Sequence, residues 1–137
     1  MDQSLQVAME SYYLSATHKT PRLSFDFANG TFEISGRSIP ENSIEFYKPL
    51  LKCLDEYIKD PKEQTHLKII LEYFNTSSSK CLVEIFRRLE KLHKDGQNLK
   101  IDWYYEQEDE DILESGEDFR EIMKLPIEMV LINGAKE

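Results

Sequence analysis

The stretch of sequence that decides the fold is HLKIILEYFNTSSSK, residues 66–80. Residues 66–74 are almost continuously apolar, a pattern typical of a central strand that is covered on both faces. Residues 75–79 are small and polar, and their side-chain oxygens can cap the free amides at the start of a helix. Apolar residues then recur at helical spacing until Asp95-Gly96, and they are Leu82, Ile85, Phe86, Leu89 and Leu92. The segment therefore predicts a buried strand that runs directly into a helix.

Upstream of this unit, the alternation of apolar and polar residues predicts a β-hairpin. The alternation covers residues 23–27 and resumes over residues 32–34. Between the two runs, Asn29-Gly30 supplies turn residues that tolerate a positive φ angle. Gly36 is expected to close the hairpin.

A helix is predicted between the hairpin and the central strand, from Pro40 to Ile58. Its apolar positions recur at intervals of three and four, and they are Ile44, Tyr47, Leu51, Leu54 and Ile58. Pro49 has no amide donor, so it should bend this helix or split off its first turn.

A third unit follows downstream, with a strand over residues 99–105, a helix between Asp109 and Lys124, and a strand over residues 127–132. The strand over 99–105 places Leu99, Ile101, Trp103 and Tyr105 on one face. Three strand–helix–strand steps imply parallel crossovers, which are nearly always right-handed. The predicted fold is α/β, a mixed sheet that opens with an antiparallel hairpin and continues through parallel crossovers.

The length of 137 residues fits one domain. We expect residues 21–137 to form it and residues 1–20 to be a loose tail or an edge strand. Hydrophobic residues make up 40% of the chain, enough for a core, and Cys53 and Cys81 are expected to be buried thiols. Neither a membrane-spanning segment nor a secretory signal is visible, so the cytoplasm is the expected compartment. The histidines lack metal-ligand spacing, and no cofactor or metal is expected.

The net charge of −9 is concentrated in one stretch. Residues 106–121 contain nine acids and one base, a charge of −8, which leaves −1 for the rest of the chain. Nucleic acid is therefore a poor candidate partner, because its phosphates require a basic footprint. A solvated loop and helix start explains the acids best, and the alternative is a docking edge for a basic partner beside Trp103, Tyr104 and Tyr105.

Motifs of known enzyme chemistry are mostly absent. Ser77 and Lys80 match the Ser-x-x-Lys motif of penicillin-recognising enzymes, but its companion motifs are missing. A small hydrolase that uses these two residues is the weakest of three hypotheses. Thr76 or a neighbouring serine should stand exposed at a helix N-terminus, where a phosphoryl group would be stabilised. Local sequence alone favours a plainer role, in which these residues only cap the helix of a constitutive interaction or scaffold protein.

Four separated blocks of the sequence resemble one protein family. They are residues 35–42 (SGRSIPEN), residues 46–50 (FYKPL), residues 71–80 (LEYFNTSSSK), and residues 103–106 with 108–111 (WYYE and EDED). In order and spacing, from about Thr20 to Ile132, the chain resembles the SiaC-type bacterial regulatory phosphoproteins. That family is similar in fold to the STAS-like anti-anti-sigma domains.

The resemblance implies a signalling switch without enzyme activity. A kinase would phosphorylate Thr76, a PP2C-like phosphatase would remove the phosphate, and the unphosphorylated form would bind and activate a diguanylate cyclase. Partner contacts are expected at Asn75, Ser77, Ser78 and Lys80, and further away at Trp103 and Tyr105. Lys80 is also expected to lie near the phosphate.

Overall fold

The computed structural model describes residues 10–132, so the expectation for residues 1–9 lies outside the described residues. The strands are Ser11–Leu14 (β1), Arg22–Asp26 (β2), Thr31–Ser38 (β3), Gln64–Phe74 (β4), Asn98–Glu106 (β5) and Ile127–Ile132 (β6). The helices are Ser43–Tyr57 (α2), Thr76–Lys94 (α3) and Glu110–Met123 (α4). The predicted elements are thus present in the predicted order, and β1 is an edge strand rather than loose chain.

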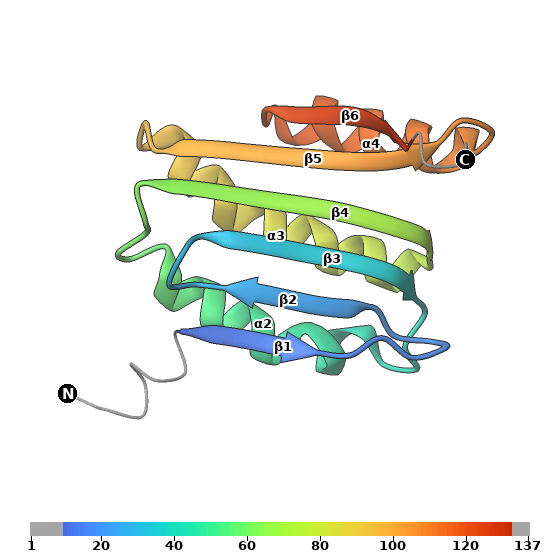
Figure 1. The fold of residues 1–137 in the computed structure, drawn as a ribbon, viewed down its shortest axis with the longest axis horizontal. Helices are drawn as coiled ribbons and strands as arrows, with labels where there is room; N and C mark the ends of the chain where they lie inside the picture. The colour runs from blue at the N-terminus through green and yellow to red at the C-terminus, as the bar shows by residue number, and fades with distance from the viewer. Residues whose placement is uncertain (1–9, 133–137) are drawn as a thin grey trace.

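The six strands form one mixed sheet in the order β1-β2-β3-β4-β5-β6. β1, β2 and β3 pair antiparallel, and β3, β4, β5 and β6 pair parallel, which confirms the predicted fold class. Because every crossover steps in the same direction along the sheet, crossovers of one hand place all their helices on the same face. Figure 1 shows α2, α3 and α4 together behind the sheet.

Within residues 10–132, no helix lies on the opposite face of the sheet, so the prediction that β4 is covered on both faces is wrong. Along β4, Leu67 and Ile69 are buried under the helices, whereas His66, Lys68 and Ile70 point to the uncovered face and are half-buried. The run of apolar residues looked continuous because Ile70 adds an apolar side chain on the uncovered face. A sheet with one solvated face is expected to alternate in this way.

The core lies between the sheet and the helices. At one end, the rings of Phe25, Phe27 and Phe32 pack together and against Tyr57 of α2. The predicted turn lies between Phe27 and Phe32, and Gly30 has a φ angle of 70° there, where a side chain would clash with the Gln64 carbonyl oxygen. The predicted stripe of α3 is entirely buried, as expected.

Helix α2 differs from its prediction in two respects. It runs without interruption from Ser43 to Tyr57, with Pro49 inside it, so its first turn is not split off. Its buried side chains are Ser43, Tyr47, Leu50, Leu54 and Tyr57. Ile44 is 69% exposed instead of buried, because the buried stripe passes through Ser43 and Tyr47 and leaves Ile44 on the outer side.

The two cysteines are free, as predicted, although only Cys81 is buried and Cys53 is half-buried. Burial raises the pKa of both thiols, which makes them weak nucleophiles. Among the residues that the structure describes, no helix is long and apolar enough to pass through a membrane.

Candidate functional site

Thr76 is the first residue of α3, directly after the end of the central strand β4 at Phe74. Asn75 caps the helix, and its side-chain oxygen accepts a hydrogen bond of 2.9 Å from the Ser78 amide. Thr76 is exposed, as its position in the sequence predicted. Within residues 10–132, its hydroxyl group makes no hydrogen bond, whereas its carbonyl oxygen accepts one from the Ser79 hydroxyl. The Thr76 hydroxyl is therefore free to react or to contact a partner.

Ser78 is fully buried, so the expectation that it contacts a partner is wrong. Its hydroxyl donates to the Ser38 carbonyl oxygen at 2.9 Å and lies 2.8 Å from the Ser38 hydroxyl. The hydroxyl of Ser43 lies 3.2 Å from that of Ser78 and 2.7 Å from that of Ser77. Helical spacing is the reason for its burial, because Ser78 falls on the same face as the buried Leu82 and Ile85. Ser78 therefore supports the site from within the protein and does not present its side chain to a partner.

A backbone irregularity in β3 brings Ser38 into this network. The pairing of β3 with β4 shifts register between Gly36 and Arg37, and the φ angle of Gly36 is 104°, a conformation that favours glycine. The strand was predicted to close at Gly36, but it continues through this bulge to Ser38. There the Ser38 hydroxyl bonds the hydroxyl of Tyr47 at 2.7 Å, and burial raises the pKa of Tyr47 far above its usual value.

The hydroxyl network joins three elements, β3, α2 and α3, directly beneath Thr76. Sequence reasoning missed Ser38, Ser43 and Tyr47, because they are separated from Thr76 by more than 25 residues of chain. The only local signal was the position of Ser43 at a helix start. Satisfied buried polar networks hold their members in one arrangement, so this network gives the first turn of α3 a rigid position.

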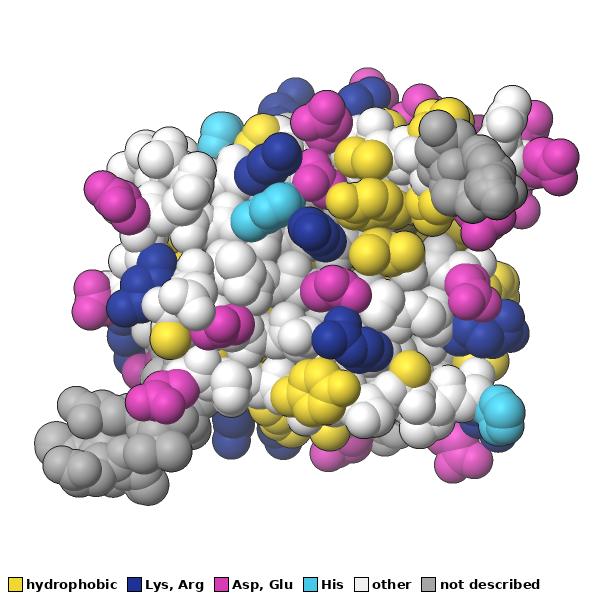
Figure 2. Space-filling view, in the orientation of Figure 1, with side chains coloured by type: hydrophobic (Ala, Val, Ile, Leu, Met, Phe, Trp, Pro, Cys, Tyr) yellow, Lys and Arg dark blue, Asp and Glu magenta, His cyan; other side chains and the backbone are white. Residues whose placement is uncertain are grey.

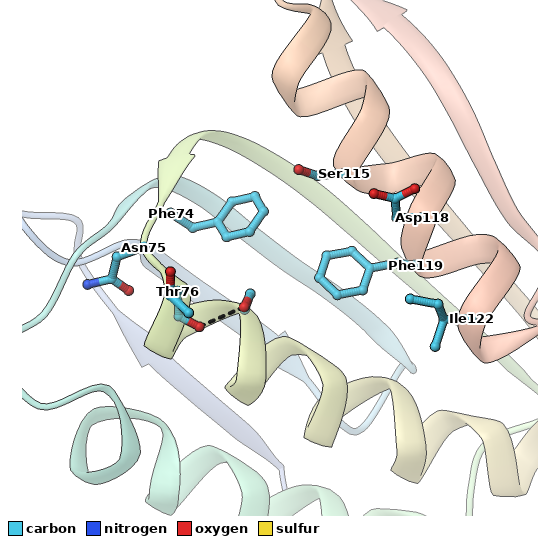
Figure 3. A pocket seen from close by; sticks show the side chains of 8 residues that line it. Phe74, Asn75, Thr76, Ser115, Asp118, Phe119 and Ile122 are labelled. Atoms are coloured by element: carbon cyan, nitrogen blue, oxygen red, sulfur yellow. Dashed lines mark hydrogen bonds between the residues drawn. The ribbon is translucent and has the colours of Figure 1, made fainter.

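A cleft of about 310 Å³ lies between the start of α3 and the facing side of α4 (Figure 3). It is lined by Phe74, Asn75, Thr76, Ser79, Ser115, Asp118, Phe119 and Ile122. Figure 3 shows the rings of Phe74 and Phe119 in the cleft, with Asp118 and Ile122 projecting from α4. The cleft thus has an apolar floor and a polar rim that includes Thr76 and one carboxylate. Sequence reasoning did not predict the contribution of α4.

Exposed apolar side chains occur near Thr76. Five large hydrophobic side chains of the described residues are exposed, and one of them, Ile122 (71%), lines the cleft together with Thr76. Tyr73 (51%) precedes Thr76 by three residues, and Ile44 (69%) follows Ser43, whose hydroxyl bonds that of Ser77. The guanidinium group of Arg37 lies 5.9 Å from the centre of the Tyr73 ring. Large apolar side chains that cluster on a surface mark interaction sites more often than isolated ones do.

Trp103 was expected to contact a partner, but it is fully buried. Its indole nitrogen donates a hydrogen bond of 2.8 Å to the Ile112 carbonyl oxygen, and its ring packs against Phe74 and Phe119. The sequence correctly placed Trp103 on the face of Leu99 and Ile101, but that face is the one that the helices cover. Trp103 therefore supports the cleft from beneath.

The other predicted residues lie apart from one another. Lys80 is exposed on α3, one helical turn after Thr76. Tyr105 is half-buried and lines a different groove, described below. The Ser-x-x-Lys pair is not assembled, because the Ser77 hydroxyl bonds Asn75 and Ser43, and no hydrogen bond joins it to Lys80 in the described part of the chain. The described residues also contain no group of acids, histidines and cysteines that could hold a metal ion.

The fold and the site define a class of protein, a small single-sheet α/β protein with an exposed threonine at the start of a helix. Comparison with known proteins identifies the family. Residues 14–132 match the model of the SiaC family regulatory phosphoproteins, and the chain belongs to this family.

The relatives agree with this assignment. An uncharacterized protein of Pseudomonas aeruginosa (strain UCBPP-PA14) is 30% identical over 118 residues, which cover 86% of this chain and 94% of that protein. The crystal structure of apo-SiaC from P. aeruginosa matches with a TM-score of 0.80 and 28% identity, over 88% of this chain and 98% of that one. SiaC in a crystal structure of the diguanylate cyclase SiaD with its activator SiaC matches with a TM-score of 0.83 and 29% identity, over 88% and 99% of the two chains.

Proposed function

We propose that this protein is a phospho-regulated binding module of a bacterial signalling pathway in the cytoplasm. In this proposal Thr76 is the phosphoacceptor, and the unphosphorylated form binds and activates a diguanylate cyclase. Membership of a family of regulatory phosphoproteins supports the first part. The second part is supported by a structural relative that is the activator of a diguanylate cyclase. The resemblance also suggests a protein kinase and a PP2C-like phosphatase as partners.

The observation that carries the proposal is the free, exposed hydroxyl of Thr76 at the start of a helix. Of the four consecutive hydroxyl residues 76–79, Ser78 is buried, and Ser77 and Ser79 already donate to Asn75 and to the Thr76 carbonyl oxygen. In the kinase reaction, the Thr76 oxygen would bond to the γ-phosphorus of ATP while ADP departs and the hydroxyl proton passes to a base on the kinase. Hydrolysis by the phosphatase would return threonine and inorganic phosphate.

The chemistry of the site fits a switch that changes binding without unfolding the domain. A phosphate adds a charge of about −1.5 to −2 at neutral pH, and the positive end of a helix dipole stabilises an anion at this position. An interface that covers the apolar side chains around Thr76 would have to bury this charge, which is costly unless a cation pairs with it. The modified form therefore stays folded and loses its partner.

The test compares wild-type protein with Thr76→Glu and with a matched control, Gln97→Glu, which adds the same charge at an exposed residue beyond the other end of α3. The partner is the diguanylate cyclase of the native cell. We expect Thr76→Glu to raise the Kd for the cyclase more than tenfold, a loss of more than about 1.4 kcal/mol. Its melting temperature should change by less than about 3 °C, because an acid is tolerated at a helix start. The control should bind normally.

Phosphopeptide mass analysis of the protein from its native cell tests the position of the modification. A phosphate on Thr76 supports the proposal, and a phosphate confined to another residue contradicts it. Equal affinity of the phosphorylated and unphosphorylated forms would favour the constitutive scaffold instead. Loss of folding in Thr76→Glu would show that Thr76 has a structural role.

A further inference from the structure

A second surface lies at the carboxyl ends of β4 and β5, where side chains of the uncovered face of the sheet, such as Ile70 and Tyr104, meet Ile112 at the start of α4. β4 and β5 pair only as far as Ile69 and Trp103, although β4 continues to Phe74 and β5 to Glu106. Beyond that point β4 pairs only with β3, and β5 pairs only with β6. The ends of the two central strands therefore separate (Figure 1), and the backbone edges that face each other there have no strand partner among the described residues.

A groove of about 560 Å³ occupies this separation. Its apolar walls are formed by Ile70, Leu71, Tyr104, Tyr105, Ile112 and Ile132. On the uncovered face, Val130 lies beside Tyr104 in the pairing of β6 with β5 and extends the apolar surface. Figure 2 shows hydrophobic side chains gathered over this part of the uncovered face, at the upper right.

The charged side chains that line the groove are all acidic. Three carboxylates line it, those of Glu72, Glu106 and Asp109, and no lysine or arginine does. None of the three forms an ion pair within residues 10–132. Asp109 is occupied as the cap of α4, where it accepts the Ile112 amide at 3.0 Å, whereas Glu72 and Glu106 are exposed. Two carboxylates at an apolar groove are thus available to an occupant.

We propose that this groove is a docking site for a basic segment of a partner protein, with apolar side chains against Ile70 and Tyr104 and cationic side chains opposite Glu72 and Glu106. Covering the carboxylates with a neutral or acidic occupant would desolvate them without a counter-charge, which is costly. A cationic occupant removes that cost and is attracted from a distance by the acidic stretch 106–121. The surface does not include Thr76, so this docking is separate from the phospho-regulated contact.

The test uses two synthetic helical peptides of 14 residues as probes, one built of leucine and lysine and the other of leucine and glutamate. Binding to the full chain is measured by calorimetry, and the location is mapped by amide chemical shifts. We expect the lysine peptide to bind and to shift the amides of residues 70–72 and 104–106. In the double variant Glu72→Gln/Glu106→Gln, the Kd for this peptide should rise about tenfold.

A matched control separates docking from general attraction to an acidic protein. Glu114→Gln/Glu117→Gln changes the net charge by the same two units, and both residues are exposed on α4 outside the groove. This control should keep the Kd within about twofold of the wild-type value. An equal loss in both double variants overturns the proposal, as does equal binding of the glutamate peptide or a failure of the lysine peptide to bind. Self-association that is lost in Glu72→Gln/Glu106→Gln would overturn it as well, by making the occupant a second copy of the chain.

Discussion

The contact between Gly116 and Trp103 offers a sharp test of how the cleft is built. Gly116 lies inside α4, and a Cβ atom added to it would collide with Cδ1 of the indole ring and lie 2.6 Å from Nε1. The indole cannot easily move aside. It is fully buried, its nitrogen is bonded to the Ile112 carbonyl oxygen at 2.8 Å, and its ring packs against Phe74 and Phe119. Gly116→Ala should therefore force α4 away from β5.

Two opposing effects set the magnitude of this change. Alanine is favoured over glycine inside a helix by about 1 kcal/mol. Overpacking a rigid core costs about 1–3 kcal/mol, and loss of the buried indole hydrogen bond costs another 1–3 kcal/mol or so. The cost of the collision should exceed the gain in helix propensity, and we expect Gly116→Ala to lower the free energy of unfolding by about 2 kcal/mol. For a domain of this size the melting temperature should fall by roughly 5–10 °C.

Urea unfolding followed by tryptophan fluorescence suits this measurement, because Trp103 is the only tryptophan in the chain. The neighbouring Glu117→Ala is the control, since Glu117 is exposed and its replacement should change the stability by less than about 0.5 kcal/mol. A Gly116→Ala protein as stable as the wild type would refute the reasoning, because it would mean that the indole and α4 adjust without cost.

Two further changes test the polar groups beneath the site and on the uncovered face. Ser78→Ala should lower the free energy of unfolding in urea by about 1–3 kcal/mol, because it leaves the buried Ser38 hydroxyl and carbonyl groups short of a partner; the exposed Ser77→Ala should cost less than about 1 kcal/mol. His66→Ala should cost about 2 kcal/mol by the same measurement, since Asp102 is buried. Within residues 10–132, its Oδ1 already has no partner, and its other oxygen bonds only His66, at 2.8 Å. An unchanged midpoint in either buried-group variant would contradict the corresponding account.

The order and type of the elements could be predicted because each is encoded locally. Period-two alternation marked the hairpin, helical spacing marked α3, and the small polar residues after Phe74 marked the point where strand becomes helix. The position of Thr76 follows from that local change alone. The surroundings of Thr76 do not, because Ser38, Ser43 and the cleft side of α4 come from distant segments. A bulge at Gly36 and the packing of α4 on Trp103 decide where those segments lie, and neither leaves a periodic signal.

The incorrect prediction that β4 is covered on both faces has a physical cause that bears on function. Ile70 made β4 look buried on both faces, yet in the part of the chain that the structure describes no helix covers the second face. Apolar side chains on a solvated face cost free energy in contact with water, and sequences keep them there when a partner covers them or when they pack on their neighbours. Tyr104 and Val130 do lie side by side, but Ile70 faces the opening where β4 and β5 no longer pair. Beside two exposed carboxylates, that position is explained better by an occupant of the groove than by packing within the sheet.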